Sequence, residues 1–147
     1  RLFNLVKPAR AYFGEKDFQQ IAVIKAMVKQ LNIDVTIVEC AIVRGEDGLA
    51  LSSRNELLTP EHRKAAPHIY ATISQAAEKM KTMTPAELTE WMVTTIDSNP
   101  LLKTIYFEAV DALTMQRVES WEESERIQGC CAVQAGDIRL IDNIRIK

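Results

Sequence analysis

The chain has 147 residues, of which 47% are hydrophobic and 26% are charged, with five glycines and five prolines. This composition is typical of a soluble globular protein that has room for one core or two small ones. A formal net charge of −2 argues against a general nucleic-acid binder, because such a protein needs a basic face to neutralise phosphates. No apolar run approaches the length of a membrane span, so we expect no membrane partner.

The cysteines indicate a reducing compartment. Cys40, Cys130 and Cys131 make an odd number, with no C-x-x-C spacing and no secretory signal at the N-terminus. We therefore expect a cytoplasmic protein. The neighbours Cys130 and Cys131 would point to opposite faces of a strand, which suits neither a metal site nor a disulfide, so we expect buried apolar thiols.

Residues 1–43 predict a strand, a helix and a strand, which is a βαβ unit with a parallel sheet. Residues 11–13 form a short aromatic run that ends at Gly14, Asp17 can cap the following helix, and residues 33–42 are apolar at most positions, as in a strand covered on both faces. The expected apolar side of the helix is Ile21, Val23, Ile24, Met27, Val28 and Leu31. Two strands and one helix cannot cover both faces of such a sheet, so we expect the chain to be part of a larger protein.

Residues 59–147 predict two helices on a small antiparallel sheet. A helix begins at Thr59 and should break near Pro67, and a capping box at Thr84 begins a second helix. The expected buried side of the second helix is Leu88, Trp91, Met92, Thr95 and Ile96. Residues 105–110, in which Ile105, Phe107 and Ala109 alternate with Tyr106, Glu108 and Val110, predict a strand. The runs 127–135 and 138–146, joined at Gly136 and Asp137, predict a hairpin.

Two polar segments have the chemistry to bind phosphate. Gly14 leaves room for a ligand near the backbone, the following helix start offers free N–H groups, and Lys16 adds a positive charge. Ser52, Ser53 and Arg54 combine two neutral hydroxyl donors with a fixed cation, which suits a polyanion. From the residues alone, a tight turn with a solvated lysine and a solvated polar loop are the alternatives.

Longer motifs around these segments resemble a known family. The sequence FGEKDFQQ over residues 13–20, followed by Val43, Arg44 and the sequence DGLALSSRN over residues 47–55, resembles the pantothenate synthetase (pantoate-beta-alanine ligase) family. The resemblance implies an ATP-dependent ligase that condenses pantoate with β-alanine through a pantoyl adenylate, with ATP as a substrate together with Mg²⁺. It also implies a homodimer for the full-length enzyme.

The resemblance assigns parts of an α/β fold to three ranges of the chain. Residues 1–43 would be a remnant of a Rossmann-like nucleotide-binding domain, namely the C-terminal part of its parallel sheet. Residues 44–58 would be a hinge loop similar to the KMSKS loop of class I aminoacyl-tRNA synthetases, and residues 59–147 a small α+β lid domain.

The resemblance also assigns roles to individual residues. The ATP-binding residues would be Gly14, Glu15, Lys16, Asp17, Val43, Leu51, Ser52, Ser53 and Arg54. Of these, Lys16 would stabilise charge on the α-phosphate, while Ser52, Ser53 and Arg54 would hold the leaving pyrophosphate, and all four are the catalytic candidates. Gln20 would bind pantoate. Magnesium would bridge the phosphates and keep several waters, so no residue is expected to be a metal ligand.

One departure from the family pattern bears on activity. The family carries an H-x-G-H motif that this sequence lacks, and the only histidines, His62 and His68, are expected at the surface without a catalytic task. We therefore expect a C-terminal fragment that makes no pantothenate alone. The alternative is a non-catalytic lid that self-associates. Arg139, Arg145 and Lys147 are too few to support a nucleic-acid role.

Overall fold

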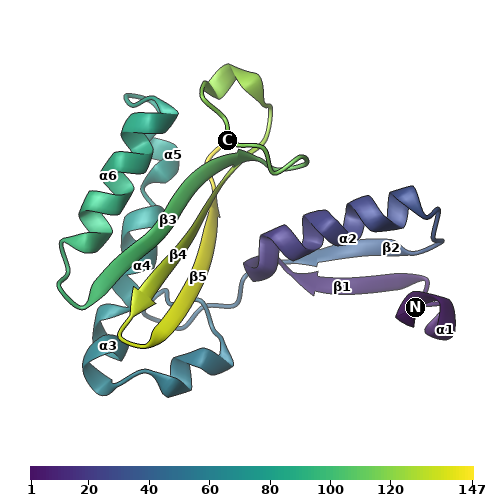
Figure 1. Cartoon of the computed structure of the whole chain (residues 1–147), viewed down its shortest axis with the longest axis horizontal. Helices are drawn as coiled ribbons and strands as arrows, with labels where there is room; N and C mark the ends of the chain where they lie inside the picture. Colours follow the sequence, from purple (N-terminus) through teal and green to yellow (C-terminus); the bar gives the residue numbers. More distant parts are fainter. The chain divides into compact units, whose positions relative to one another are not determined.

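The computed structural model describes all residues from 1 to 147 and divides into two units, Arg1–Ile42 and Val43–Lys147. Each unit has its own secondary structure (Figure 1). Residues 44–58, the predicted hinge loop, belong to the second unit, which begins one residue earlier at Val43. The longest helices have 13 residues, and none has the length and apolar character needed to cross a membrane.

The first unit is the predicted βαβ arrangement. Its elements are α1 (Leu2–Val6), β1 (Arg10–Gly14), the 3-10 turn η1 (Glu15–Asp17), α2 (Phe18–Gln30) and β2 (Thr36–Cys40). Strands β1 and β2 are parallel, with Ala11 opposite Ile37, and α2 is the connection between them. Asn32 adopts a left-handed conformation just after α2, as residues that end a helix often do.

Burial in this unit is lower than the sequence predicts. Ile21 is buried and Val28 is half-buried, but Leu31 is 64% exposed and Val23 is 68% exposed. Only two strands are present for α2 to cover, so part of its apolar side stays exposed, although Lys25 pairs with Glu39 of β2. No residue of β2 is fully buried and Cys40 is exposed, which corrects the expectation of a strand covered on both faces over residues 33–42.

The prediction for the start of α2 was wrong in one detail. Asp17 occupies the N-cap position, but its side chain accepts no capping hydrogen bond. The preceding 3-10 turn explains the difference, because it leads into the helix through successive turns and leaves Asp17 exposed.

The second unit is an antiparallel sheet with helices on one face. Its elements are η2 (Ser53–Leu57), α3 (Pro60–Ala65), α4 (Pro67–Ile73), α5 (Ala76–Lys79), α6 (Pro85–Asp97), β3 (Leu102–Asp111), η3 (Trp121–Glu123), β4 (Ile127–Ala135) and β5 (Ile138–Arg145). The strand order is β3-β4-β5, and α4, α5 and α6 lie together along this sheet in Figure 1. The first predicted helix is divided into three short ones, of which α4 begins at the expected break.

Helix α6 supplies much of the core of this unit. Thr84 and Glu87 form the predicted capping box at its start. Leu88, Met92 and Ile96, spaced by four residues, are fully buried. Trp91 and Thr95, also predicted on this side, are half-buried. They complete a side of the helix that packs on the sheet. The sheet residues of the same core include Phe107, Ile127, Cys131, Val133 and Leu140.

A β-bulge changes the predicted alternation of β3. The pairing with β4 shifts between Thr104 and Tyr106, so Ile105 is left without a partner and is 50% exposed. The extra residue lets Leu102 and Phe107 both face the core although they are five positions apart. Ile105 was therefore wrongly predicted to share a face with Phe107.

The predicted hairpin is present in the last two strands. Ala135 is opposite Ile138, and Gly136 has a φ of 62°, which a glycine adopts readily. Cys130 and Cys131 are buried in β4, as expected. Burial raises the pKa of Cys130 to about 12 and also raises the pKa of Cys131, so both are neutral thiols at neutral pH.

Replacing Leu88 with alanine should lower the free energy of unfolding of the second unit by about 2–5 kcal/mol, because the side chain is fully buried in the core. Urea unfolding followed by tryptophan fluorescence measures this, since both tryptophans, Trp91 and Trp121, lie in this unit. The exposed neighbour Glu90→Ala is the control, with a change within about 0.5 kcal/mol. Equal effects of the two variants would contradict the assigned core.

Acid should destabilise the second unit through Asp111. Hydrogen bonds to its carboxylate lower the pKa of Asp111 to about 2 from its ordinary 3.8. The Ser124 hydroxyl, at 2.6 Å, has the largest effect, and the Thr114 amide, at 2.7 Å, has the next largest. Because the folded pKa is depressed, this stabilisation is present above about pH 4 and is lost as the pH falls toward 2. Asp111→Asn should reduce the difference between unfolding midpoints measured at about pH 5 and pH 2.5. The exposed Asp137→Asn should leave the difference unchanged.

Candidate functional site

The first predicted segment lies where β1 ends and α2 begins. Gly14 is the last residue of β1 and has an ordinary extended φ of −72°. A Cβ placed on Gly14 would meet no atom within 4 Å. Neither the backbone conformation nor packing within the structure requires a glycine here. Its effect is to leave open space at the carboxyl end of the strand, where ligands bind in parallel sheets.

Polar side chains follow Gly14 along the chain. Lys16 is half-buried in the 3-10 turn, and Asp17 and Gln20 are exposed at the start of α2. The first N–H groups of a helix have no partner within it and favour an anion. Together with the Lys16 ammonium, the helix start can stabilise a phosphate.

The second predicted segment begins with a tightly bonded turn. The Leu51 amide donates to the Val43 carbonyl at 2.9 Å, and the Gly45 amide donates to the Leu49 carbonyl at 2.9 Å. Leu49 is buried in the core of the second unit, whereas Val43 is 68% exposed and Leu51 is 49% exposed. The turn is therefore anchored in the core between two exposed ends.

The serine-containing loop, defined as residues 51–54, follows this turn. The Ser52 hydroxyl accepts a hydrogen bond from the Arg54 amide at 3.2 Å, which starts the turn η2. Ser53 and Arg54 are exposed, and Ser52 is half-buried. The Arg54 guanidinium donates to the Arg139 carbonyl on β5 at 3.2 Å. The loop thus presents one guanidinium and two hydroxyls at the surface, a set of donors that suits a polyanion.

Each unit holds one of the two predicted sets of residues. Gly14, Glu15, Lys16, Asp17 and Gln20 belong to the first unit. The predicted residues of the second unit are Val43, Leu51, Ser52, Ser53 and Arg54. Within each unit, the members of a set are close in sequence and lie on one strand end, turn or loop.

A charged pair of low exposure next to the loop was not predicted from the sequence. Arg44 forms two hydrogen bonds to the carboxylate of Asp142 on β5, at 2.7 and 2.9 Å. The Arg44 guanidinium also lies over the ring of Tyr70, 3.8 Å from its centroid. The sequence contains one indication of this pair. Asp142 is separated by even numbers of positions from the buried Leu140 and Ile146, so it lies on the core-facing side of the strand, where an acidic residue needs a partner.

A second ion pair holds the same turn at the surface. Asp47 accepts a hydrogen bond from Arg63 at 2.6 Å and another from the Leu49 amide at 3.2 Å. Both hydrogen bonds lower the pKa of Asp47 below its ordinary value, and the one from Arg63 has the larger effect. Asp47 is therefore charged at neutral pH, and the pair links the turn to α3.

Both histidines have structural partners. The Nδ1 atom of His62 is 2.7 Å from the Thr59 hydroxyl, and the His62 ring lies against Gly136. The Nε2 atom of His68 is 2.9 Å from the Thr95 carbonyl. Both rings are half-buried, which corrects the expectation of plain surface residues. No group of three or more His, Cys, Asp or Glu side chains is placed to hold a metal ion.

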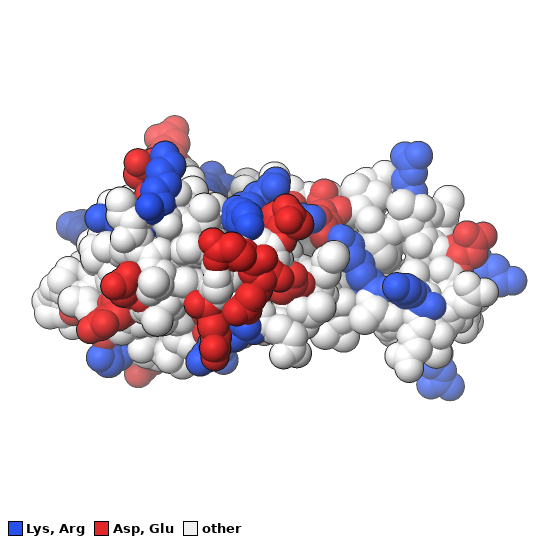
Figure 2. Space-filling view, turned by 90° about the horizontal axis from the view of Figure 1, so that it is seen from above, with Lys and Arg blue, Asp and Glu red and all other residues white.

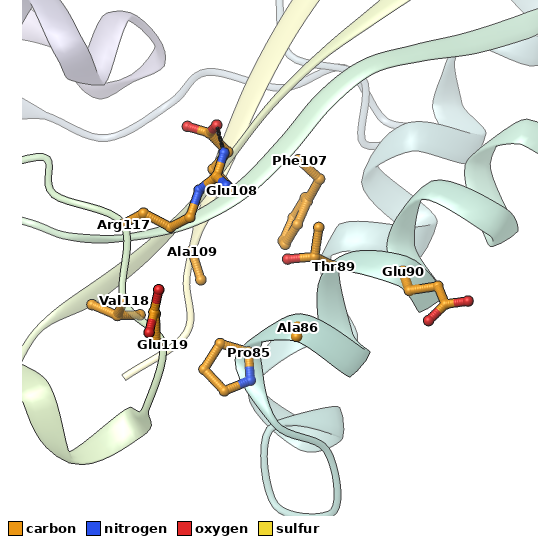
Figure 3. A pocket seen from close by; sticks show the side chains of 10 residues that line it. All are labelled: Pro85, Ala86, Thr89, Glu90, Phe107, Glu108, Ala109, Arg117, Val118 and Glu119. Atoms are coloured by element: carbon orange, nitrogen blue, oxygen red, sulfur yellow. Dashed lines mark hydrogen bonds and ion pairs between the residues drawn. The ribbon is translucent and has the colours of Figure 1, made fainter.

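A pocket of about 540 Å³ lies elsewhere in the second unit (Figure 3). Its apolar wall includes Phe107 and Val118, and Glu108 and Arg117 pair at its edge. The remaining lining residues are Pro85, Ala86, Thr89, Glu90, Ala109 and Glu119. None of the predicted site residues lines this pocket. Figure 2 shows both signs of charge on the visible face, with several acidic side chains grouped together.

Comparisons with known proteins agree with the motifs. The family model described as pantoate-beta-alanine ligase matches residues 1–145. Pantothenate synthetases of Porphyromonas gingivalis strain ATCC 33277 and Bacteroides fragilis strain YCH46 are each 48% identical over 147 residues, covering 100% of this chain and 52% of the relative. The chain thus spans about half the length of these curated relatives and corresponds to their C-terminal half.

Solved structures show the same similarity. A crystal structure of pantothenate synthetase from Thermus thermophilus has a TM-score of 0.90 and 39% identity, covering 99% of this chain and 52% of that one. Pantoate-beta-alanine ligase from Francisella tularensis, complexed with βγ-ATP and β-alanine, has a TM-score of 0.71 and 32% identity over 99% of this chain and 46% of that one. With its two motifs placed at a strand end and on an anchored loop, the chain belongs to the pantoate-beta-alanine ligase family.

Proposed function

We propose that this chain supplies the ATP-handling residues of a ligase that condenses pantoate with β-alanine through a pantoyl adenylate. The family match over residues 1–145 is the observation that carries the proposal. Further support comes from the open strand end at Gly14 and from the exposed donors of the serine-containing loop. A cytoplasmic location is part of the same proposal.

In the first step, a carboxylate oxygen of pantoate attacks the α-phosphorus of ATP, and the bond to the β-phosphate oxygen breaks to release pyrophosphate. Negative charge builds up on the phosphate oxygens, so fixed cations and hydrogen-bond donors lower the barrier. Lys16 stabilises the α-phosphate, while Ser52, Ser53 and Arg54 hold the departing pyrophosphate.

The other predicted residues position the substrates of this step. Gly14, Glu15 and Asp17 line the ATP site at the strand end, and Val43 contacts the adenine through its backbone, next to Leu51. Magnesium enters with ATP as part of the substrate. Such an ion would be held by the phosphates and by water, so it needs no protein ligand.

In the second step, the amine of β-alanine attacks the acyl carbonyl of the adenylate. The acyl–phosphate bond breaks, AMP leaves, and the amide of pantothenate forms with loss of a proton from the amine. Gln20 holds pantoate, because its amide both donates and accepts hydrogen bonds. The solved structure of the Francisella tularensis relative is a complex with βγ-ATP and β-alanine, which supports this pairing of substrates.

We further propose that the chain alone does not complete the reaction. It spans about half the length of its relatives, and it contains no H-x-G-H sequence to supply imidazoles to the phosphates. The activity then requires the N-terminal half of a family member, and the whole enzyme is a homodimer.

Pyrophosphate release from MgATP should depend on pantoate and on the added N-terminal half of a relative, such as the Porphyromonas gingivalis enzyme. In this mixture, Arg54→Ala should lower the rate by about 100-fold or more, because it removes a cation from the leaving group. The exposed Lys64→Ala on α3 should not change the rate. A colorimetric pyrophosphate assay measures both variants.

Three results would count against this function. They are release by the chain alone, release without pantoate, and equal rates for the Arg54 and Lys64 variants.

A second candidate function is self-association without catalysis. The observation that favours it is the exposed apolar surface of the first unit, where Leu2, Leu5 and Val6 of α1 are 64–78% exposed and Tyr12 of β1 is 62% exposed. Isolated apolar side chains at a surface are common, but four on two adjacent elements favour contact with another protein surface.

Sedimentation velocity on the chain alone tests this surface. We expect a concentration-dependent shift from monomer to dimer, which Leu5→Glu should reduce because it places a charge among apolar neighbours. Leu113→Glu in the second unit, also strongly exposed, is the matched control and should leave the shift unchanged. A folded chain that stays monomeric at all concentrations would eliminate the second candidate and leave the ligase proposal untouched.

A further inference from the structure

We propose that Arg44 is a positioning residue that fixes the serine-containing loop to the body of the C-terminal unit. The pyrophosphate-binding groups of residues 51–54 would then move with the second unit as one body. The proposal rests on the proposed function only for the identity of the ligand that this loop holds.

The first contact of Arg44 is a buried two-point hydrogen bond. Its two terminal nitrogens donate to the two carboxylate oxygens of Asp142, at 2.7 and 2.9 Å, and only 16% and 5% of the respective side chains are exposed. A planar guanidinium bound at two points to a carboxylate has one favoured orientation. The pair therefore fixes both the position and the direction of Arg44 relative to β5.

The same guanidinium holds the turn from two further directions. It donates to the Gly48 carbonyl at 3.1 Å, and its face lies over the Tyr70 ring of α4. Gly48 has a φ of 85°, and a Cβ on it would lie 2.4 Å from the Tyr70 ring. The turn, Arg44 and Tyr70 thus form one packed cluster in which a side chain at position 48 has no room.

Backbone hydrogen bonds connect the Arg44 cluster to the serine-containing loop. Arg44 pairs with Ala50 in an antiparallel bridge, and the Leu51 amide bonds to the Val43 carbonyl. The Ala50 carbonyl in turn accepts a hydrogen bond from the Asn55 side chain at 3.1 Å, just beyond the loop. Both ends of the loop are therefore bonded to residues that the Arg44 cluster holds.

The neighbouring pair of Asp47 and Arg63 differs from Arg44 in burial. Its side chains are 36% and 40% exposed, so water and salt weaken the attraction. Because this pair holds the same turn at the surface, it provides a matched comparison for the buried pair.

Hydrogen exchange of backbone amides tests the proposal on this chain. Replacing Arg44 with methionine together with Asp142→Leu removes both charges and leaves neither partner buried alone. The amides of Gly45 and Leu51 should then exchange about tenfold faster or more, while those of β4 stay protected. Arg63→Gln should change the same amides by less than about threefold. The single variant Arg44→Lys should also exchange faster than the unmodified chain at these amides. Lysine keeps the charge, but it lacks the planar guanidinium that binds both carboxylate oxygens of Asp142.

Two exchange results would overturn the proposal. One is unchanged protection of Gly45 and Leu51 in the double variant. The other is an equal loss of protection in β4, which would show that the pair supports the whole unit and not the loop.

A kinetic arm separates positioning from folding. In the mixture with the N-terminal half, the double variant should raise the inhibition constant for pyrophosphate about tenfold or more and leave the KM for pantoate unchanged. A smaller folded fraction would lower kcat alone, and that result would also overturn the proposal. If the unmodified mixture releases no pyrophosphate, the proposed function fails, and the exchange result alone decides the role of Arg44.

Discussion

The pair formed by Arg44 and Asp142 is the contact on which the second candidate segment depends. It joins residues 98 positions apart, under low exposure and with two hydrogen bonds. A buried charge is costly unless it is paired, so the two residues require one another. Leu49 adds an apolar anchor in the core, and the loop that follows is left exposed at the surface with its donors available.

The two candidate segments offer phosphate-binding groups of different kinds. In the first unit, Gly14 leaves open space at the end of a strand, next to Lys16 and the start of α2. In the second unit, the donors are the hydroxyls and the Arg54 guanidinium of an anchored loop. A reaction that builds charge on one phosphate and releases two others has use for donors on separate elements, which is the basis of the proposed function.

The sequence predicted those features that depend on local physics. The capping box at Thr84, the glycine in the last hairpin and the two polar motifs are each contained in a few neighbouring residues, and each is present in the structure. The bulge at Ile105 and the partner of Arg44 depend on pairing between distant segments, which no local pattern reveals. The exposure of Leu31 was missed because helical periodicity shows which side of a helix is apolar but not what covers it.

In the proposed mechanism, pantoate is activated before β-alanine takes part. Exchange of labelled pyrophosphate into ATP, measured with this chain and an N-terminal half in the presence of Mg²⁺, tests this most directly. We expect exchange that requires pantoate and occurs without β-alanine, because the adenylate forms reversibly in the first step. Exchange that begins only when β-alanine is added would contradict the formation of a pantoyl adenylate in the first step. Pantothenate formation without any exchange would contradict the roles given to Lys16 and to the serine-containing loop.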